Sequence, residues 1–242
     1  MNHLPFVSTS RYTSIERDRS RTLTDIWTFF DVKYGNLHSI TPWPVGEMAS
    51  LTAEEARGKL ITKIKDLAYL YSDEEEFTLA SGRKSRHFFD MKPVMMNPEC
   101  AHYLGILIHS EIEKLGNIDA VGGLELGAVP LTGIAIAKTS RGSELRGFIV
   151  RKEPKGRGGR KTGNPPGIEG STLRKGDRVV LLEDVTTTGG SALMASNKLS
   201  EMGCQVVACI TILDREEGGA KSFKEAGIPL LPLTKKSDIT EG

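Results

Sequence analysis

The stretch "VVLLEDVTTTGGSALMA", from Val179 to Ala195, carries the residues best suited to chemistry. Its apolar run predicts a buried strand that ends at two acids, and a helix is predicted to begin near Gly190, after a turn of threonines and glycines. Backbone N–H groups at the start of a helix have no partners within it, and the helix dipole adds positive charge there. The turn therefore predicts an anion site of the kind that holds phosphate.

The side chains around this turn favour a phosphorylated sugar as the ligand. Glycines let the backbone approach a ligand closely and hydroxyls add donors; the residues concerned are Thr187, Thr188, Gly189, Gly190 and Ser191. No lysine follows in the G-x-x-x-x-G-K pattern, so the turn is not a Walker loop. Glu183 and Asp184 can accept hydrogen bonds from sugar hydroxyls or hold a metal beside a second phosphate group. A helix N-cap with incidental acids is the alternative.

Apolar segments that alternate between strand and helix spacing imply an α/β fold with a central parallel sheet flanked by helices. Strands are predicted over 118–126, 145–153, 176–185, 205–214 and 228–234, helices over 51–71, 97–115, 128–140, 190–203 and 219–227, and a strand–turn–strand over 77–92. Thr52 is the predicted N-cap of the first helix, with Glu55 completing a capping box. Ligands bind beyond the carboxyl ends of such strands, where "GLELG", "RKEPKGRGG", "EDVTTTGGS" and "DREEGG" lie.

The segment 151–170, "RKEPKGRGGRKTGNPPGIEG", differs from the rest in composition. It holds many glycines, three prolines and six cations, and it has almost nothing to bury. It is therefore predicted to be a mobile surface loop. A loop of this length inside a compact domain is usually functional, although a merely solvated charged loop is the alternative.

Composition excludes several classes of protein. The chain has 242 residues, 38% of them hydrophobic and 26% charged, with a formal net charge of +1. No basic field argues for nucleic acid, and no apolar run approaches the ~18 residues of a membrane span. The cysteines Cys100, Cys204 and Cys209 form no C-x-x-C pair, which favours free thiols in a reducing cytoplasm.

Residues 1–47 show no chemistry and are treated as an extension of unknown role. Met48 precedes the predicted capping box, so it is a candidate natural start, which mass spectrometry of the native protein would test. The domain is predicted to span 48–242.

"VVLLEDVTTTGGS" resembles the signature of type I phosphoribosyltransferases, which bind 5-phosphoribosyl 1-diphosphate (PRPP). "FTLASGRKSRHFFDMK", "FIVRKEPKGRGG" and "ILDREEGG" are similar, in order and spacing, to segments of orotate phosphoribosyltransferases. The resemblance covers roughly 50–235. It implies the type I phosphoribosyltransferase fold, with a small N-terminal hood at about 51–92. It also implies transfer of ribose 5-phosphate from PRPP to orotate, giving orotidine 5′-monophosphate and diphosphate in pyrimidine biosynthesis.

The resemblance also assigns roles to residues. It implies that PRPP contacts Glu183, Asp184, Val185, Thr186, Thr187, Thr188, Gly189, Gly190 and Ser191. Some members of the family have a lysine where this chain has Gly127, but Gly123 and Gly127 flank the end of a strand, so "GLELGA", with Leu126 and Gly127, is interpreted as a backbone anion loop for the diphosphate. The resemblance implies an orotate site formed by Phe88, Phe89, Thr187 and Arg215. It implies catalytic roles for Arg151, Lys152, Lys155, Arg157 and Asp184. Any metal is expected to be Mg²⁺ carried by the oxygen atoms of PRPP, not held by the protein alone.

Several assignments keep an alternative. Phe88 and Phe89 suit core packing as well as a base pocket, and Arg215 suits a salt bridge with Glu216 or Glu217. Arg157 stands where the family commonly has a histidine, so it keeps a cation but cannot exchange a proton near neutral pH.

The resemblance implies a homodimer in which loop 151–170 reaches the active site of the partner. Two other functions remain open: a phosphoribosyltransferase for a purine base, and a PRPP-sensing regulator without catalysis. A panel of bases would distinguish the first, and PRPP binding without turnover would indicate the second.

Overall fold

The computed structural model describes residues 51–74, 76–78, 82, 84–139, 144–153 and 163–241. These residues fall within one compact unit, Glu47–Gly242. The extension 1–47 and the candidate start at Met48 lie outside the described residues. Within the described part, no helix is both long and apolar enough to cross a membrane.

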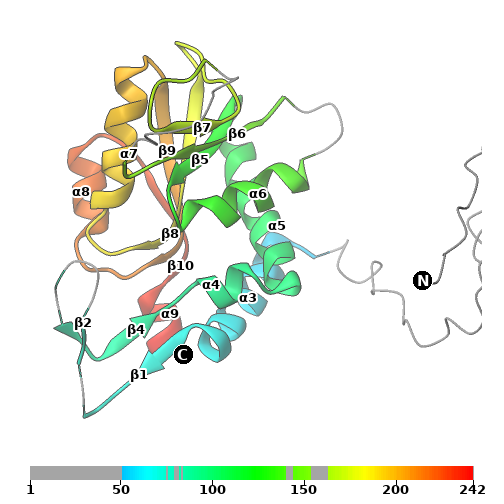
Figure 1. Ribbon diagram of the computed structural model, residues 1–242. Helices are drawn as coiled ribbons and strands as arrows, with labels where there is room; N and C mark the ends of the chain where they lie inside the picture. Colours follow the sequence, from blue (N-terminus) through cyan, green and yellow to red (C-terminus); the bar gives the residue numbers. More distant parts are fainter. Residues whose placement is uncertain are drawn as a thin grey trace, which may run out of the picture. The chain divides into compact units, whose positions relative to one another are not determined.

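A six-stranded sheet forms the centre of the fold, in the order β10-β9-β8-β5-β6-β7 (Figure 1). Its strands are β5 (Ala120–Leu124), β6 (Arg146–Val150), β7 (Ile168–Gly170), β8 (Arg178–Thr186), β9 (Gln205–Asp214) and β10 (Leu230–Lys235). Five strands run parallel, and β7 pairs antiparallel with β6 at one edge. The predicted α/β architecture is confirmed, with a sheet that is mainly parallel.

Helices cover both faces of this sheet because its central strands are apolar on both sides. The helices are α3 (Ala53–Leu67), α4 (Lys92–Met95), α5 (Pro98–Leu115), α6 (Ala128–Lys138), α7 (Gly190–Glu201), α8 (Gly219–Glu225) and α9 (Lys236–Thr240). α7 and α8 lie on one face, and α5 and α6 lie on the other (Figure 1). Successive residues of β8 alternate accordingly: Leu181 packs with the α7 side and Leu182 with the α5 side.

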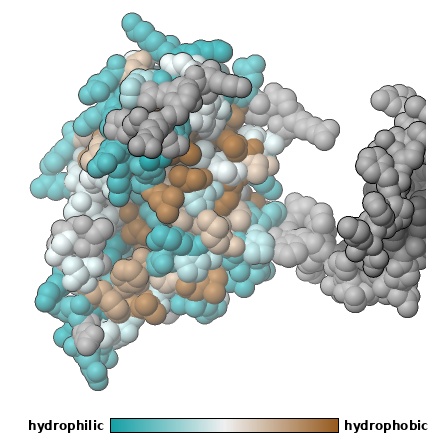
Figure 2. All heavy atoms as spheres, in the orientation of Figure 1, coloured by the Kyte–Doolittle hydropathy of each residue, from teal (hydrophilic) through white to brown (hydrophobic). Residues whose placement is uncertain are grey.

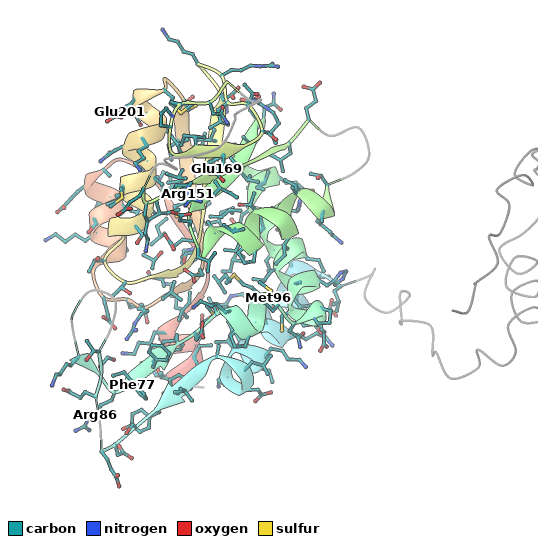
Figure 3. All side chains as sticks on the ribbon, in the orientation of Figure 1. Phe77, Arg86, Met96, Arg151, Glu169 and Glu201 are labelled. Atoms are coloured by element: carbon teal, nitrogen blue, oxygen red, sulfur yellow. The ribbon has the colours of Figure 1, made fainter. Side chains whose placement is uncertain are left out.

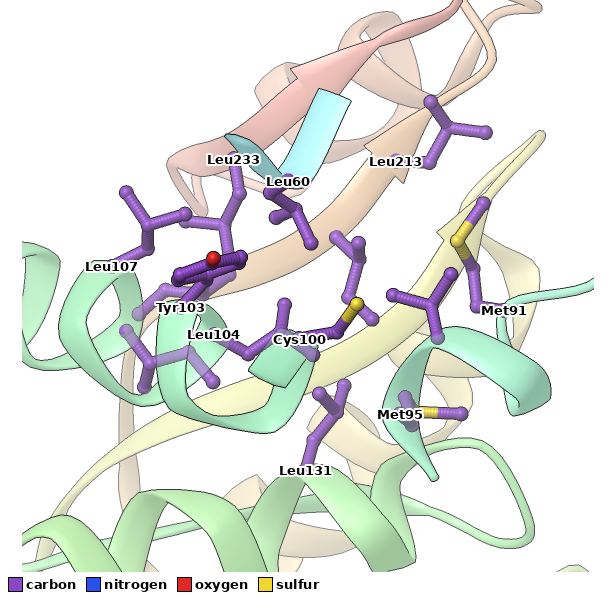
Figure 4. Packing of buried hydrophobic residues seen from close by; sticks show 14 of the residues in the cluster. Leu60, Met91, Met95, Cys100, Tyr103, Leu104, Leu107, Leu131, Leu213 and Leu233 are labelled. Carbon is purple, nitrogen blue, oxygen red and sulfur yellow. The ribbon is translucent and has the colours of Figure 1, made fainter. Parts of the chain in front are cut away.

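The larger core cluster joins the α3, α5 and α6 helices to the sheet (Figure 4). Leu60 of α3, Leu104 of α5 and Leu131 of α6 are almost fully buried within it. The cluster also includes Met91, the N-cap residue of α4, and Met95, the last residue of that helix. Because each buried side chain of this size contributes roughly 1.5–3 kcal/mol, this cluster fixes the first helix and the short α4 against the sheet.

A small hood precedes the sheet and consists of α3, α4 and two two-stranded ribbons. β1 (Tyr69–Tyr71) pairs antiparallel with β4 (His87–Phe89), and β2 (Phe77–Thr78) pairs antiparallel with β3 (Lys84–Ser85). The capping box at the start of α3 is confirmed, since Thr52 Oγ1 accepts the Glu55 N–H and the Glu55 carboxylate accepts the Thr52 N–H. The strands predicted after it, within 77–92, are also confirmed as β2, β3 and β4, while most of the predicted turn lies outside the described residues.

Two predictions about secondary structure were wrong. The first helix was expected to run to Tyr71, but it ends at Leu67, and Tyr71 instead pairs with His87 across a strand ladder. The segment 151–170 was expected to bury almost nothing, but Ile168 is 3% exposed and lies in β7. The short helices α4 and α9 were not predicted, because four or five residues carry too little periodicity.

Candidate active site

A cavity of about 230 Å³ lies at the carboxyl end of β8, where the sequence predicts a phosphate cup. Its lining residues come from the end of β8 and the start of α7: Glu183, Val185, Thr186, Thr187, Thr188, Gly189, Gly190 and Ser191. The structure therefore brings eight of the predicted PRPP contacts together around one space. This is the edge of a parallel sheet at which α/β proteins bind ligands.

The turn into α7 needs glycine at position 189. Gly189 has φ of 85°, in the left-handed region that side chains rarely adopt, and a Cβ there would lie 3.0 Å from the Phe223 ring. α7 then starts at Gly190, so its first N–H groups face the cavity region without helical partners. Among the described residues, Thr186 Oγ1 is buried with no hydrogen-bond partner, which suits a site that a polar ligand completes.

Glu183 and Asp184 have different environments although they are neighbours. Glu183 is 8% exposed, and burial, reinforced by the negative charge of Asp184 and a hydrogen bond to it, raises the pKa of Glu183 to about 9. Asp184 is half-buried, and its Oδ1 accepts the Val185 N–H at 2.9 Å. Near neutral pH, Glu183 is therefore protonated, and can donate as well as accept a hydrogen bond.

The segment between β5 and α6 closes over Asp184. The Glu125–Leu126 peptide bond is cis, and Leu126 is 66% exposed. Gly127 lies directly against the acid: a Cβ at this position would be 2.4 Å from Asp184 Cγ. The predicted diphosphate residues Leu126 and Gly127 thus lie next to the paired acids, and only glycine permits the close approach of Gly127.

The predicted loop cations divide between described and undescribed residues. Arg151 and Lys152 directly follow β6, while Lys155 and Arg157 lie outside the described residues. The positive charge of Lys152 acts to lower the pKa of Glu183, against the larger effect of burial, so Lys152 lies near enough to Glu183 for its charge to be felt there. Arg151 is engaged elsewhere: its Nη1 is 3.3 Å from Glu125 Oε2 and 3.7 Å from Glu169 Oε1, and Figure 3 shows Arg151 beside Glu169.

Arg215 connects the hood to the end of β9. It is 3% exposed, and its Nε and Nη2 bond to Glu217 Oε1 at 3.0 and 2.9 Å. Nη2 also donates to Ser85 Oγ and the His87 carbonyl, both at 3.1 Å. The salt bridge considered for Arg215 is present with Glu217, but it is buried, and it orients the guanidinium over the Phe89 ring at 5.6 Å.

Phe88 and Phe89 have unequal surroundings. Phe89 is 6% exposed and stacks on Tyr69 with ring centroids 5.1 Å apart, so its ring is part of the core. Phe88 is half-buried and packs against Phe77 at 5.5 Å. Thr187, the other predicted orotate contact, is half-buried in the cavity lining.

Within the described part of the chain, no three histidine, cysteine, aspartate or glutamate side chains cluster as a metal site. The three cysteines are buried and free. The side-chain oxygen atoms that line the cavity are instead those of Glu183 and of the hydroxyls of the turn.

Comparison with known proteins gives consistent likenesses. Residues 97–226 match the phosphoribosyl transferase domain family. An orotate phosphoribosyltransferase of Bradyrhizobium diazoefficiens is 47% identical over 168 residues, which cover 68% of this chain and 87% of that protein. One from Aquifex aeolicus is 41% identical over 184 residues, covering 76% of this chain and 97% of that protein.

Solved structures show the same likeness in three dimensions. The Mycobacterium tuberculosis orotate phosphoribosyltransferase in complex with PRPP superposes with a TM-score of 0.60 at 28% identity, over 76% of this chain and 98% of that chain. The superposed structures include the same enzyme with Fe(III) dicitrate, at a TM-score of 0.64 and 29% identity, covering 76% and 99%.

Proposed function

The chain belongs to the orotate phosphoribosyltransferase family, and from that premise we propose which of its residues carry the reaction. It has the type I phosphoribosyltransferase fold and transfers the 5-phosphoribosyl group of PRPP to orotate, forming orotidine 5′-monophosphate and diphosphate. The observation that supports the assignment of roles is the cavity at the end of β8, which is lined by Glu183 and by the residues at the N-terminus of α7.

PRPP binds through its 5′-phosphate in the turn Thr186–Ser191. The N–H groups at the start of α7 and the hydroxyls of Thr187, Thr188 and Ser191 donate to the phosphate oxygens. Glu183 and Asp184 bond the ribose hydroxyls: the Asp184 side chain accepts, and the protonated Glu183 can donate or accept. Val185 and Gly189 complete the wall of the cavity.

The diphosphate leaves toward the loop cations. Breaking its bond to C1 of ribose builds negative charge on the diphosphate and positive charge on the sugar. The backbone at Leu126 and Gly127 and the side chains of Lys152, Lys155 and Arg157 stabilise that negative charge. Arg151 joins them by exchanging a carboxylate partner, Glu125 or Glu169, for a diphosphate oxygen. Catalysis rests on positioning and electrostatics, without covalent chemistry by the protein.

Orotate binds between the hood and the cavity. Phe88 offers a ring wall, while the buried Phe89 contributes through its backbone and through its contact with Arg215. Among the described residues, Arg215 bonds through Nε and Nη2 only, so Nη1 is available to the orotate carboxylate. Thr187 lies where it can bond both the phosphate and the base.

Mg²⁺ fits this site as a companion of PRPP. The donors at the cavity are hard oxygens, which Mg²⁺ prefers, and they are too few to cage the ion without the substrate. When bound to the diphosphate, Mg²⁺ would offset the charge of the leaving group.

We further propose a cytoplasmic homodimer in which loop 151–170 is shared across subunits, with Lys155 reaching the partner's site. Large apolar side chains on the surface support an interface: Met96 is 68% and Leu126 is 66% exposed. Hydrophobic patches also interrupt the polar surface on the face shown in Figure 2. The buried free cysteines suit a reducing compartment.

The loss of orotate absorbance in the presence of PRPP and Mg²⁺ tests the proposed function. Loss that requires both additions and the enzyme is expected. If orotate is not consumed while PRPP still binds, the orotate assignment is wrong. Turnover of a purine base would then indicate a purine phosphoribosyltransferase, and turnover of no base would indicate a PRPP-sensing regulator.

A further inference from the structure

Two residues outside the predicted site hold the start of the cation-bearing loop. Lys198 Nζ donates to the carbonyl oxygens of Arg151 and Lys152, at 2.8 and 3.5 Å. Glu125 Oε1 accepts the Lys152 N–H at 2.9 Å, and Glu125 Oε2 lies 3.3 Å from Arg151 Nη1. The backbone on both sides of the Arg151–Lys152 peptide bond is therefore fixed by side chains from two other elements. We call Glu125 and Lys198 the loop clamp.

Lys198 belongs to a helix that lines the PRPP cavity, and Glu125 belongs to a segment that lies against Asp184, the neighbour of Glu183 in that cavity. Lys198 lies on α7, whose first residues line the phosphate cup. At a rise of about 1.5 Å per residue, Lys198 lies roughly 10 Å from Ser191 along the helix axis, and the helix between them is a rigid connection. Glu125 directly precedes Leu126 and Gly127, and Gly127 contacts the Asp184 side chain. The loop clamp thus links the phosphate cup, the diphosphate segment and the loop cations.

The contacts of the loop clamp contribute little to the free energy of unfolding, although there are several of them. A hydrogen bond to a carbonyl typically contributes about 0.5–1.5 kcal/mol, and ordering a lysine side chain costs up to about 2 kcal/mol. The pair Glu125–Arg151, whose side chains are 22% and 27% exposed, adds little more after screening by water. Catalytic geometry is far less tolerant, because a displacement of about 1 Å can lower a rate about 100-fold. The arrangement is therefore better explained by positioning than by stability.

We propose that Glu125 and Lys198 are positioning residues that set Lys152 relative to the PRPP cavity. They do not touch the reacting atoms; they act through the backbone of residues 151 and 152. The inference rests on the proposed function, because it assigns these contacts a role in the departure of diphosphate.

Steady-state kinetics of Lys198→Met test the proposal. Methionine keeps an unbranched side chain but cannot donate to the two carbonyls. We expect kcat to fall about tenfold to 100-fold, with KM for orotate within about twofold of wild type and little change in Tm. Lys198→Arg retains a donor of similar reach and should restore most of the rate. Lys221→Met on α8, where the lysine is 82% exposed, is the matched control and should leave kcat unchanged.

Glu125→Ala tests the other member. It removes both acceptors, so it should lower kcat to a similar extent, while Glu125→Gln, which keeps an acceptor for the Lys152 N–H, should lower it less. The double variant Glu125→Ala with Lys198→Met should lose less than the product of the two single losses, since both act on the same peptide unit.

The outcomes separate this inference from the proposed function. If wild type consumes orotate and Lys152→Ala loses that activity, but Lys198→Met and Glu125→Ala keep wild-type kcat, the loop clamp has no positioning role. A loss of rate that Lys198→Arg does not restore, with Tm lowered in parallel, would also overturn the proposal in favour of a structural role. Absence of turnover in the wild type would instead contradict the proposed function.

Discussion

Among single residues, Glu183 gives the clearest prediction of how stability depends on pH, because burial keeps its carboxyl group protonated. Its pKa is raised from 4.5 to about 9 in the folded protein, so folding binds a proton between these pH values. The stability that comes from this group is fully present below about pH 4.5 and is lost as the pH rises toward 9, by at most about 1.4 kcal/mol per pH unit.

Glu183→Gln should therefore be similar in stability to wild type near pH 5, and more stable than wild type at pH 8. Urea unfolding across this range, without PRPP or Mg²⁺, measures the difference. Glu225→Gln is the control, since that side chain is 68% exposed. A stability difference between Glu183→Gln and wild type that stays constant with pH would show that Glu183 is ionised when buried.

Asp184 has a different role from Glu183, that of a hydrogen-bond acceptor for the ribose hydroxyls. Asp184→Asn keeps the size of the side chain but loses its charge and one acceptor, so ribose hydroxyls would be held less well. We expect KM for PRPP to rise about tenfold or more, with KM for orotate little changed, because one charge-assisted hydrogen bond is worth about 1.5–3 kcal/mol. Unchanged PRPP kinetics would contradict the ribose contact.

Residue types alone predict the phosphate cup because its members are contiguous in the sequence. Thr187 to Ser191 need only the strand before them and the helix after them to face one cavity. The partners of Arg215 could not be predicted in this way. Its hydrogen bonds to Ser85 and the His87 carbonyl span about 130 positions, and no local pattern encodes that contact. Glu125 and Lys198 were missed for the same reason.

At the scale of elements, we predict that the β5–α6 segment can keep its position against Asp184 only because residue 127 is a glycine and has no side chain. The backbone there has φ of −58° and ψ of −40°, which alanine adopts freely, so any effect of Gly127→Ala comes from the clash with Asp184. The carboxylate or the segment must move, and KM for PRPP should rise about tenfold, as expected for a displaced binding group.

Gly133→Ala, on α6, is the control for this change. No atom lies within 4 Å of the position of its Cβ, and alanine favours helix, so this variant should gain about 0.5–1 kcal/mol of stability and keep wild-type kinetics. Equal PRPP kinetics in both variants would mean that Asp184 does not bind PRPP through the position seen here.

Periodicity predicted the long elements well and the short ones poorly. α5 begins after its Asn97 cap and ends at Leu115 as expected, and β9 matches its predicted bounds, because an 18-residue helix and a ten-residue apolar run leave little ambiguity. Tyr69–Tyr71 fitted the helical spacing of α3 equally well, and only pairing with β4 decides its strand conformation. β7 could not be predicted from the sequence, because its one large apolar residue, Ile168, forms no periodic pattern.

At the scale of the whole molecule, the question is which subunit supplies each cation to a site. The loop clamp holds Lys152 within its own subunit, and the charge of Lys152 acts on Glu183 of the same chain. Lys155 is three residues farther along the loop, outside the described residues, and is the cation proposed to serve the partner. Two pairs of impaired variants can therefore be mixed and compared, at a PRPP concentration far below the KM of Asp184→Asn.

Asp184→Asn mixed with Lys155→Ala should recover activity if the loop works across a dimer. Half of the dimers would be mixed after random exchange, and one of the two sites in each mixed dimer would hold both an intact Asp184 and an intact partner Lys155. About a quarter of wild-type activity is then expected. Asp184→Asn mixed with Lys152→Ala should recover almost none, because both defects act within one subunit.

Recovery in neither mixture, despite proven exchange of subunits, would show that each subunit uses its own loop. Recovery in both would show that Lys152 also acts across the interface, and that its place beside its own Glu183 is not the one used in catalysis.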